Sequence, residues 1–91
     1  MKKTFPLQSP SREDARVRDK IRQEVNRDVR RQRRKPLPEG FERWEFNCRV
    51  GLTPETAEVR SLKDVGHAIE AIAVTGATAV YVEILPVPML R

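Results

Sequence analysis

The residue types that perform nucleophilic catalysis are scarce in this chain. Cys48 is the only cysteine and His67 the only histidine, so a cysteine–histidine pair is the one such arrangement available. However, Cys48 follows Trp44 and Phe46 at every second position, which places all three side chains on the inner face of one strand. A buried thiol usually serves as a small hydrophobic side chain. We therefore expect no catalytic residues and no enzymatic activity.

Other chemical sites are not indicated either. One histidine and one cysteine are too few for a structural zinc site, which takes about four such ligands. The carboxylates of Glu42 and Glu45 are separated by Arg43, as on a solvated strand surface. The four glycines are dispersed, so the sequence has no glycine-rich phosphate loop. We predict no metal, no cofactor and no small-molecule substrate.

The distribution of charge is the most informative property of the sequence. The net charge is +5, and residues 12–35 contain eleven basic and five acidic residues. Such a basic segment attracts polyanions. Plotted as a helix, its basic residues lie mostly opposite an apolar stripe that recurs at every fourth position from Val17 to Val29. The candidate nucleic-acid-binding residues are Arg12, Arg16, Lys20, Arg27, Arg30, Arg31, Arg33, Arg34 and Lys35.

Two interpretations of this basic helix stay open. Opposite charges three or four residues apart, such as Asp28 and Arg31, are typical of a solvated helix, and basic residues at a helix C-terminus complement its dipole. Against this, like charges at the same spacing, such as Arg30 and Arg34, disfavour a helix, and arginine suits bidentate phosphate contacts. Only Tyr81 on the expected outer sheet face could stack on a base. Binding, if it occurs, is therefore expected to be backbone-directed and largely independent of sequence.

The sequence predicts two helices. The first begins near Ser11, which forms a capping-box pattern with Asp14, and ends at or before Lys35 because a proline follows. The second runs from about Leu62 to Thr75. Its expected N-cap and C-terminal left-handed residue are Ser61 and Gly76.

Segments of period two separate these helices. Residues 43–50 and 80–84 alternate between apolar and polar side chains, as strands with one wet face do. Pro86 is expected to end the later strand. Phe5 and Leu7 suggest a short first strand, whereas residues 58–60 fit either a short strand or part of a segment that begins with a helical turn.

The resulting βαββαβ order fits a ferredoxin-like α+β sandwich, with a mainly antiparallel sheet and both helices on one face. We expect a single domain over residues 1–85 and a flexible C-terminal tail over residues 86–91. The sequence has no apolar run long enough to span a membrane, and none that makes its N-terminus a signal peptide. A cytoplasmic location is therefore expected.

Four segments carry a resemblance that covers nearly the whole chain. In order, they are Met1-Lys2-Lys3-Thr4-Phe5, Arg33-Arg34-Lys35-x-Leu37-Pro38-Glu39-Gly40, Trp44-x-Phe46-x-Cys48-x-x-Gly51 and Tyr81-Val82-Glu83-Ile84-Leu85. Together they resemble a family of short uncharacterised bacterial proteins filed as a domain of unknown function. The resemblance implies no activity and supplies no site residues.

Two functions follow as hypotheses. The first is a small non-enzymatic domain that binds RNA or DNA through its basic first helix. The alternative is a protein-interaction or homodimerisation module, because the fold has two sheet edges and a mixed-charge outer sheet face. That face is expected to comprise, among its charged residues, Arg43, Glu45, Arg49, Glu58, Arg60 and Glu83. Docking on an anionic membrane is less well supported, because the helix lacks large apolar residues to insert.

Overall fold

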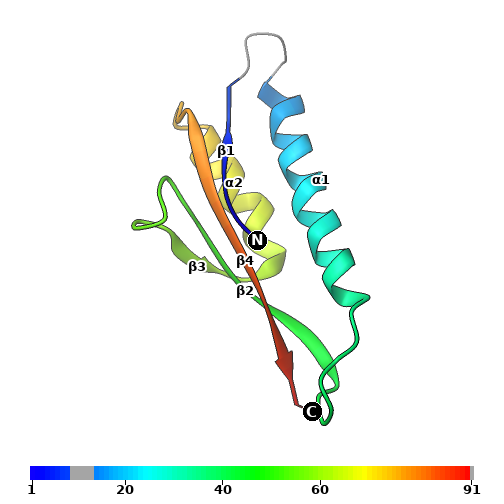
Figure 1. Cartoon of the computed structure of the whole chain (residues 1–91). Helices are drawn as coiled ribbons and strands as arrows, with labels where there is room; N and C mark the ends of the chain where they lie inside the picture. The colour runs from blue at the N-terminus through cyan, green and yellow to red at the C-terminus, as the bar shows by residue number, and fades with distance from the viewer. Residues whose placement is uncertain (9–13, 91) are drawn as a thin grey trace.

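The fold is an antiparallel sheet packed against two helices (Figure 1). The structure is a computed structural model, and it describes residues 1–8 and 14–90. The elements follow the expected βαββαβ order. They are β1 (Lys2–Pro6), α1 (Asp14–Arg33), β2 (Arg43–Gly51), β3 (Glu58–Arg60), a short 3-10 helix (Leu62–Asp64), α2 (Val65–Ala73) and β4 (Ala79–Met89).

The strand order within the sheet is β1-β4-β2-β3, and every neighbouring pair is antiparallel. The ferredoxin-like order, which has β1 and β3 at its centre, is therefore not confirmed. The physical reason lies in strand length and composition. β4 has eleven residues and β2 has nine, and they pair along the whole of β2, whereas β3 has three. The long apolar strands gain most from a central position, and short strands suit exposed edges.

α1 forms as its apolar stripe predicts. Ile21, Val25 and Val29 are buried, and Val17 packs beside them. The helix ends at Arg33, within the limit expected from the proline at position 36. The expected capping box at Ser11 lies outside the described residues.

The second predicted helix is divided in two. Its first turn is the 3-10 helix, and α2 then continues from Val65 to Ala73. The Ser61 hydroxyl donates a hydrogen bond to the Asp64 carboxylate at 2.8 Å, and its side chain makes no capping bond to the backbone. Gly76 has φ +83°, so the left-handed residue expected after the helix is confirmed.

One face of the sheet carries the core. The strand register places Val82 beside Val50 and Ile84 beside Cys48, and all four side chains are buried. Buried side chains of both helices belong to the same cluster, so α1 and α2 cover this face together (Figure 1). Within residues 1–8 and 14–90, no helix covers the opposite face of the sheet.

The prediction that Pro86 ends the last strand is wrong. β4 continues to Met89, with Pro86 opposite Phe46 and Pro88 opposite Trp44, so residues 86–89 belong to the sheet. The backbone N–H of Ile84 donates to Met1 on the β1 side, and N–H groups of alternate residues point the same way. At positions 86 and 88, the side of β4 that faces β1 lies beyond the end of β1. The two prolines therefore remove no ladder hydrogen bond.

Candidate nucleic-acid interface

The basic candidates occupy the surface of α1 that faces away from the core. Because the helix buries one stripe, residues on the opposite side of each turn must point outward. The structure places eight of the nine candidates in exposed positions on α1 or in the turn after it, and Arg12 lies outside the described residues. The eight are Arg16, Lys20, Arg27, Arg30, Arg31, Arg33, Arg34 and Lys35.

Other arginines of α1 have a structural role. Glu70 of α2 accepts hydrogen bonds at 2.9 Å from both Arg18 and Arg22, so one carboxylate joins the two helices. Neither arginine was a candidate, and both lie at the flank of the helix that faces α2. Arg22 also lies 3.7 Å from the Asp19 carboxylate, so these two positive charges face two carboxylates within the fold.

Six of these exposed cations form neither an ion pair nor a cation–π contact within the described parts of the chain. By contrast, Arg31 pairs with Asp28, and the Arg33 guanidinium lies over the ring of Phe46, 5.5 Å from its centroid. The six are Arg16, Lys20, Arg27, Arg30, Arg34 and Lys35; we call them the basic row.

The basic row runs along one side of α1 and into the turn after it. The part from Arg16 to the end of α1 spans roughly 26 Å at about 1.5 Å per residue. Arg27, Arg30 and Arg34 are neighbours at spacings of three and four residues, so their side chains share one side of the helix. Guanidinium groups there are free to make bidentate contacts with phosphate oxygens.

The turn after α1 docks on the start of β2. The Trp44 indole N–H donates to the carbonyl of Lys35 at 3.1 Å, and Arg33 stacks on Phe46. Trp44 was expected in the core but is only half-buried, because β2 and β4 extend beyond the end of α1 (Figure 1). A surface hollow of about 350 Å³ lies here, lined by Arg33, Lys35, Leu37, Glu42, Arg43 and Trp44.

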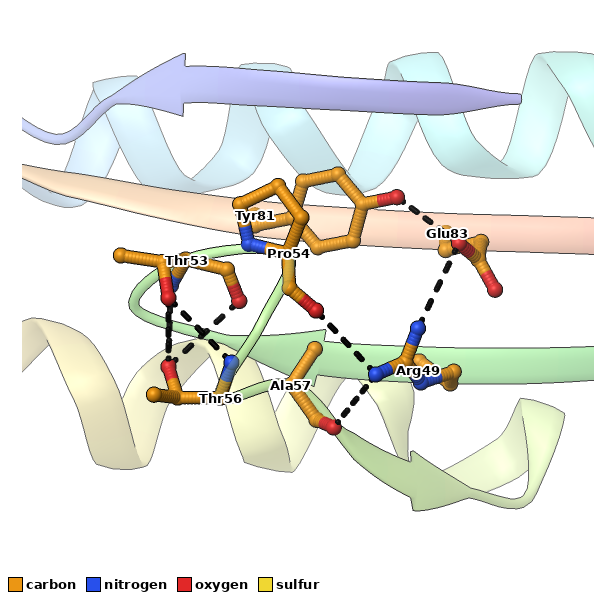
Figure 2. Close-up of polar contacts among 7 residues, drawn as sticks. All are labelled: Arg49, Thr53, Pro54, Thr56, Ala57, Tyr81 and Glu83. Carbon is orange, nitrogen blue, oxygen red and sulfur yellow. Dashed lines mark hydrogen bonds and ion pairs between the residues drawn. The ribbon is translucent and has the colours of Figure 1, made fainter.

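A second polar cluster lies on the face of the sheet that the helices leave open (Figure 2). The register places Arg49 of β2 beside Glu83 of β4, with 3.8 Å between the closest charged atoms. The Tyr81 hydroxyl donates a hydrogen bond to the Glu83 carboxylate at 2.8 Å. This cluster was not predicted. Predicting this cluster requires the register between β2 and β4, because the register decides which outward-facing residues are neighbours.

The loop between β2 and β3 folds back against this cluster. Arg49 donates to the carbonyl oxygens of Pro54 at 3.1 Å and Ala57 at 3.0 Å, as Figure 2 shows. Gly51 permits this return, because a Cβ there would lie 2.5 Å from the Ala57 Cα. Tyr81 is consequently only 6% exposed, and its pKa is raised by the hydrogen bond to Glu83 and by burial. It is not accessible for stacking on a base.

The outer sheet face differs from its predicted composition in two positions. Glu58 and Arg60 stand opposite Val50 and Cys48, whose side chains are on the helix side, and Val59 stands beside Arg49 instead. Of the charged residues predicted for this face, the four that remain on it are paired within the chain. Arg43 bonds Glu45 at 2.8 Å in addition to the contact between Arg49 and Glu83.

The cysteine and the histidine are not brought together. Cys48 is 1% exposed within the core, where burial raises the pKa of its thiol, whereas His67 is exposed on α2. No group of three or more potential metal ligands occurs within residues 1–8 and 14–90. None of the helices in the described structure is long and apolar enough to cross a membrane.

The fold and its surface define a small α+β domain with an antiparallel four-stranded sheet, two helices and one strongly basic helix face. The chain belongs to the family described as "Family of unknown function (DUF6172)", which matches residues 1–91. No curated protein and no solved structure matches the chain.

Proposed function

We propose that this protein is a small non-enzymatic domain that binds the phosphate backbone of RNA or DNA through the basic row. The observation that supports this function is the selective pairing of the arginines. Arg18 and Arg22 are paired with a carboxylate of α2, whereas Arg16, Lys20, Arg27 and Arg30 of the same helix form no ion pair in the described structure. A polyanion would supply the missing negative charge and release its own counterions.

The proposed contacts are backbone-directed. The basic row is made of long, exposed and positively charged side chains, so phosphate oxygens are their natural acceptors. A cytoplasmic location, expected from the sequence, is part of the same proposal.

A salt series of fluorescence anisotropy measurements tests this function. Six phosphate contacts predict a slope of about −5 in log K against log salt on duplex DNA, at about −0.9 per contact. Arg27/Arg30/Arg34→Ala should flatten the slope to about −3. Alanine is a good helix former, so circular dichroism should show these exposed changes to be tolerated.

The matched control removes three positive charges elsewhere. Lys2/Arg60/Lys63→Ala has the same net charge as the first variant but leaves α1 intact. It should keep a slope near that of the wild type. Equal slopes for the two variants would reduce binding to net charge, and absence of binding at about 50 mM salt would refute the proposed function.

The alternative function, a homodimerisation module, is supported by one observation on the open sheet face. Val59 is 77% exposed and Met89 is 38% exposed, and both are placed on that face by their register with Arg49 and Arg43. The charges expected to pair between protomers already pair within the chain, which weakens this alternative. Sedimentation of the wild type and Val59→Lys distinguishes the two, because only a dimer through this face would dissociate on substitution.

A further inference from the structure

The hollow at the end of α1 has properties that the basic row lacks. Its volume of about 350 Å³ falls within the range of small-ligand sites, which is about 300–1,000 Å³. An indole ring and the side chain of Leu37 give it apolar surface, and basic side chains surround them. A site of this composition suits a ligand that is flat, apolar on its faces and negatively charged at one side.

The charges of the hollow favour an anion. Three basic residues line it, against one carboxylate, that of Glu42. Arg43 is engaged with Glu45 at 2.8 Å, so Arg33 and Lys35 are the cations available to a ligand. Arg33 is already held over Phe46, which leaves less side-chain freedom to lose when an anion binds.

The aromatic surface is also fixed in advance. The Trp44 indole N–H donates a hydrogen bond to the backbone carbonyl of Lys35. The backbone N–H of Lys35 in turn donates to the carbonyl of Gln32 at 3.1 Å, which closes the turn after α1. The indole is half-buried and lines the hollow. A flat ligand could therefore stack on Trp44 without rearrangement of the surrounding chain.

The hollow continues the basic row. Arg34 and Lys35 follow directly after α1. A nucleic-acid strand bound along α1 would therefore pass the hollow at the C-terminal end of the helix. Bases of a duplex are stacked and paired, which keeps their faces away from a protein side chain. We infer that this hollow receives one unpaired base, stacked on Trp44 with its phosphate near Arg33 and Lys35, and that the preferred partner is single-stranded nucleic acid. The inference rests on the proposed function.

Trp44 is the only tryptophan, so its fluorescence reports on the hollow directly. The test compares a short oligothymidylate with an abasic strand of the same length and charge, at about 50 mM salt. Stacking of one base is expected to quench Trp44 emission and to make the oligothymidylate bind about 5- to 150-fold more tightly than the abasic strand. Trp44→Leu should abolish this preference while the variant keeps its affinity for the abasic strand.

The test includes a control variant, Tyr81→Phe, and a comparison of the two strands on the wild type. Tyr81→Phe should retain the full preference, because Tyr81 is buried on the other face of the sheet. If Trp44→Leu does not fold, the wild-type comparison with the two strands still decides. Equal affinity for both strands with unchanged Trp44 emission would overturn this inference and leave the proposed function standing. If neither strand nor a duplex binds, both fail.

Discussion

Two kinds of arginine coexist on α1, and their surroundings separate them. Arg18 and Arg22 reach Glu70 across the contact between the helices, where partial burial strengthens an ion pair. Arg27 and Arg30, one or two turns later, are exposed and have no carboxylate partner in the described structure. Composition cannot distinguish these roles, because they depend on where α2 packs.

Tyr81 gives a prediction of pH dependence. Its pKa in the folded protein is raised above the ordinary value of about 10, so the folded state holds the phenolic proton more tightly than the unfolded state. This contribution to stability is fully present below about pH 10 and is lost as pH rises through the folded-state pKa. The difference in urea stability between wild type and Tyr81→Phe should therefore shrink above about pH 10.

Tyr81 is the only tyrosine, so tyrosinate absorbance measures its pKa directly. Glu83→Gln should lower that pKa towards the ordinary value, because it removes the carboxylate that accepts the hydrogen bond from the Tyr81 hydroxyl and repels the phenolate. An ordinary pKa for Tyr81 in the folded wild type would contradict the contact between these two residues.

At the scale of elements, the prolines of β4 lead to a pair of opposite predictions. Val87 lies opposite Glu45, and its N–H points towards β2, on the other side from those of residues 86 and 88. Val87→Pro should therefore remove a ladder hydrogen bond and destabilise the fold by about 1–3 kcal/mol. Pro86→Ala should change stability by less than about 1 kcal/mol, because position 86 lies past the stretch of β4 that pairs with β1 in the described structure. Urea unfolding of the two variants measures both, and equal effects would contradict the register.

The elements themselves were largely predictable, because periodicity reports the face that each segment buries. The stripe from Val17 to Val29 indicated α1, and the alternation through Cys48 indicated β2. The short strand at Glu58–Arg60 is also confirmed. Pro86 was misleading because the cost of a proline depends on whether its missing N–H would have faced a neighbouring strand.

The arrangement of those elements was not predictable in the same way. Period two identifies the face of a strand but not its neighbours, so the sequence could not place β4 between β1 and β2. The cluster of Arg49, Tyr81 and Glu83 depends on that order. The candidate residues on α1 were found from charge spacing, whereas the hollow beside Trp44 arises from packing between a turn and a strand end.

At the scale of the whole molecule, the protein is elongated, with extents of 48 × 25 × 17 Å. Both helices lie on one side of the sheet, so the basic row and the open sheet face are on different surfaces (Figure 1). Residues 12–35 account for all of the net positive charge, which concentrates attraction for a polyanion on the helix side. The separation allows binding at α1 to be distinguished from association through the sheet.

The most direct test of the central claim is a titration of ¹⁵N-labelled protein with a short oligothymidylate, followed through the backbone amides and the arginine Nε–Hε signals. Signals of Arg27, Arg30 and Arg34 should shift as the oligothymidylate is added and return as salt is raised. Signals of Arg49 and Arg60, on β2 and β3, should stay unchanged. Shifts centred on Arg49 and Arg60, or no shift at about 50 mM salt, would contradict this expectation.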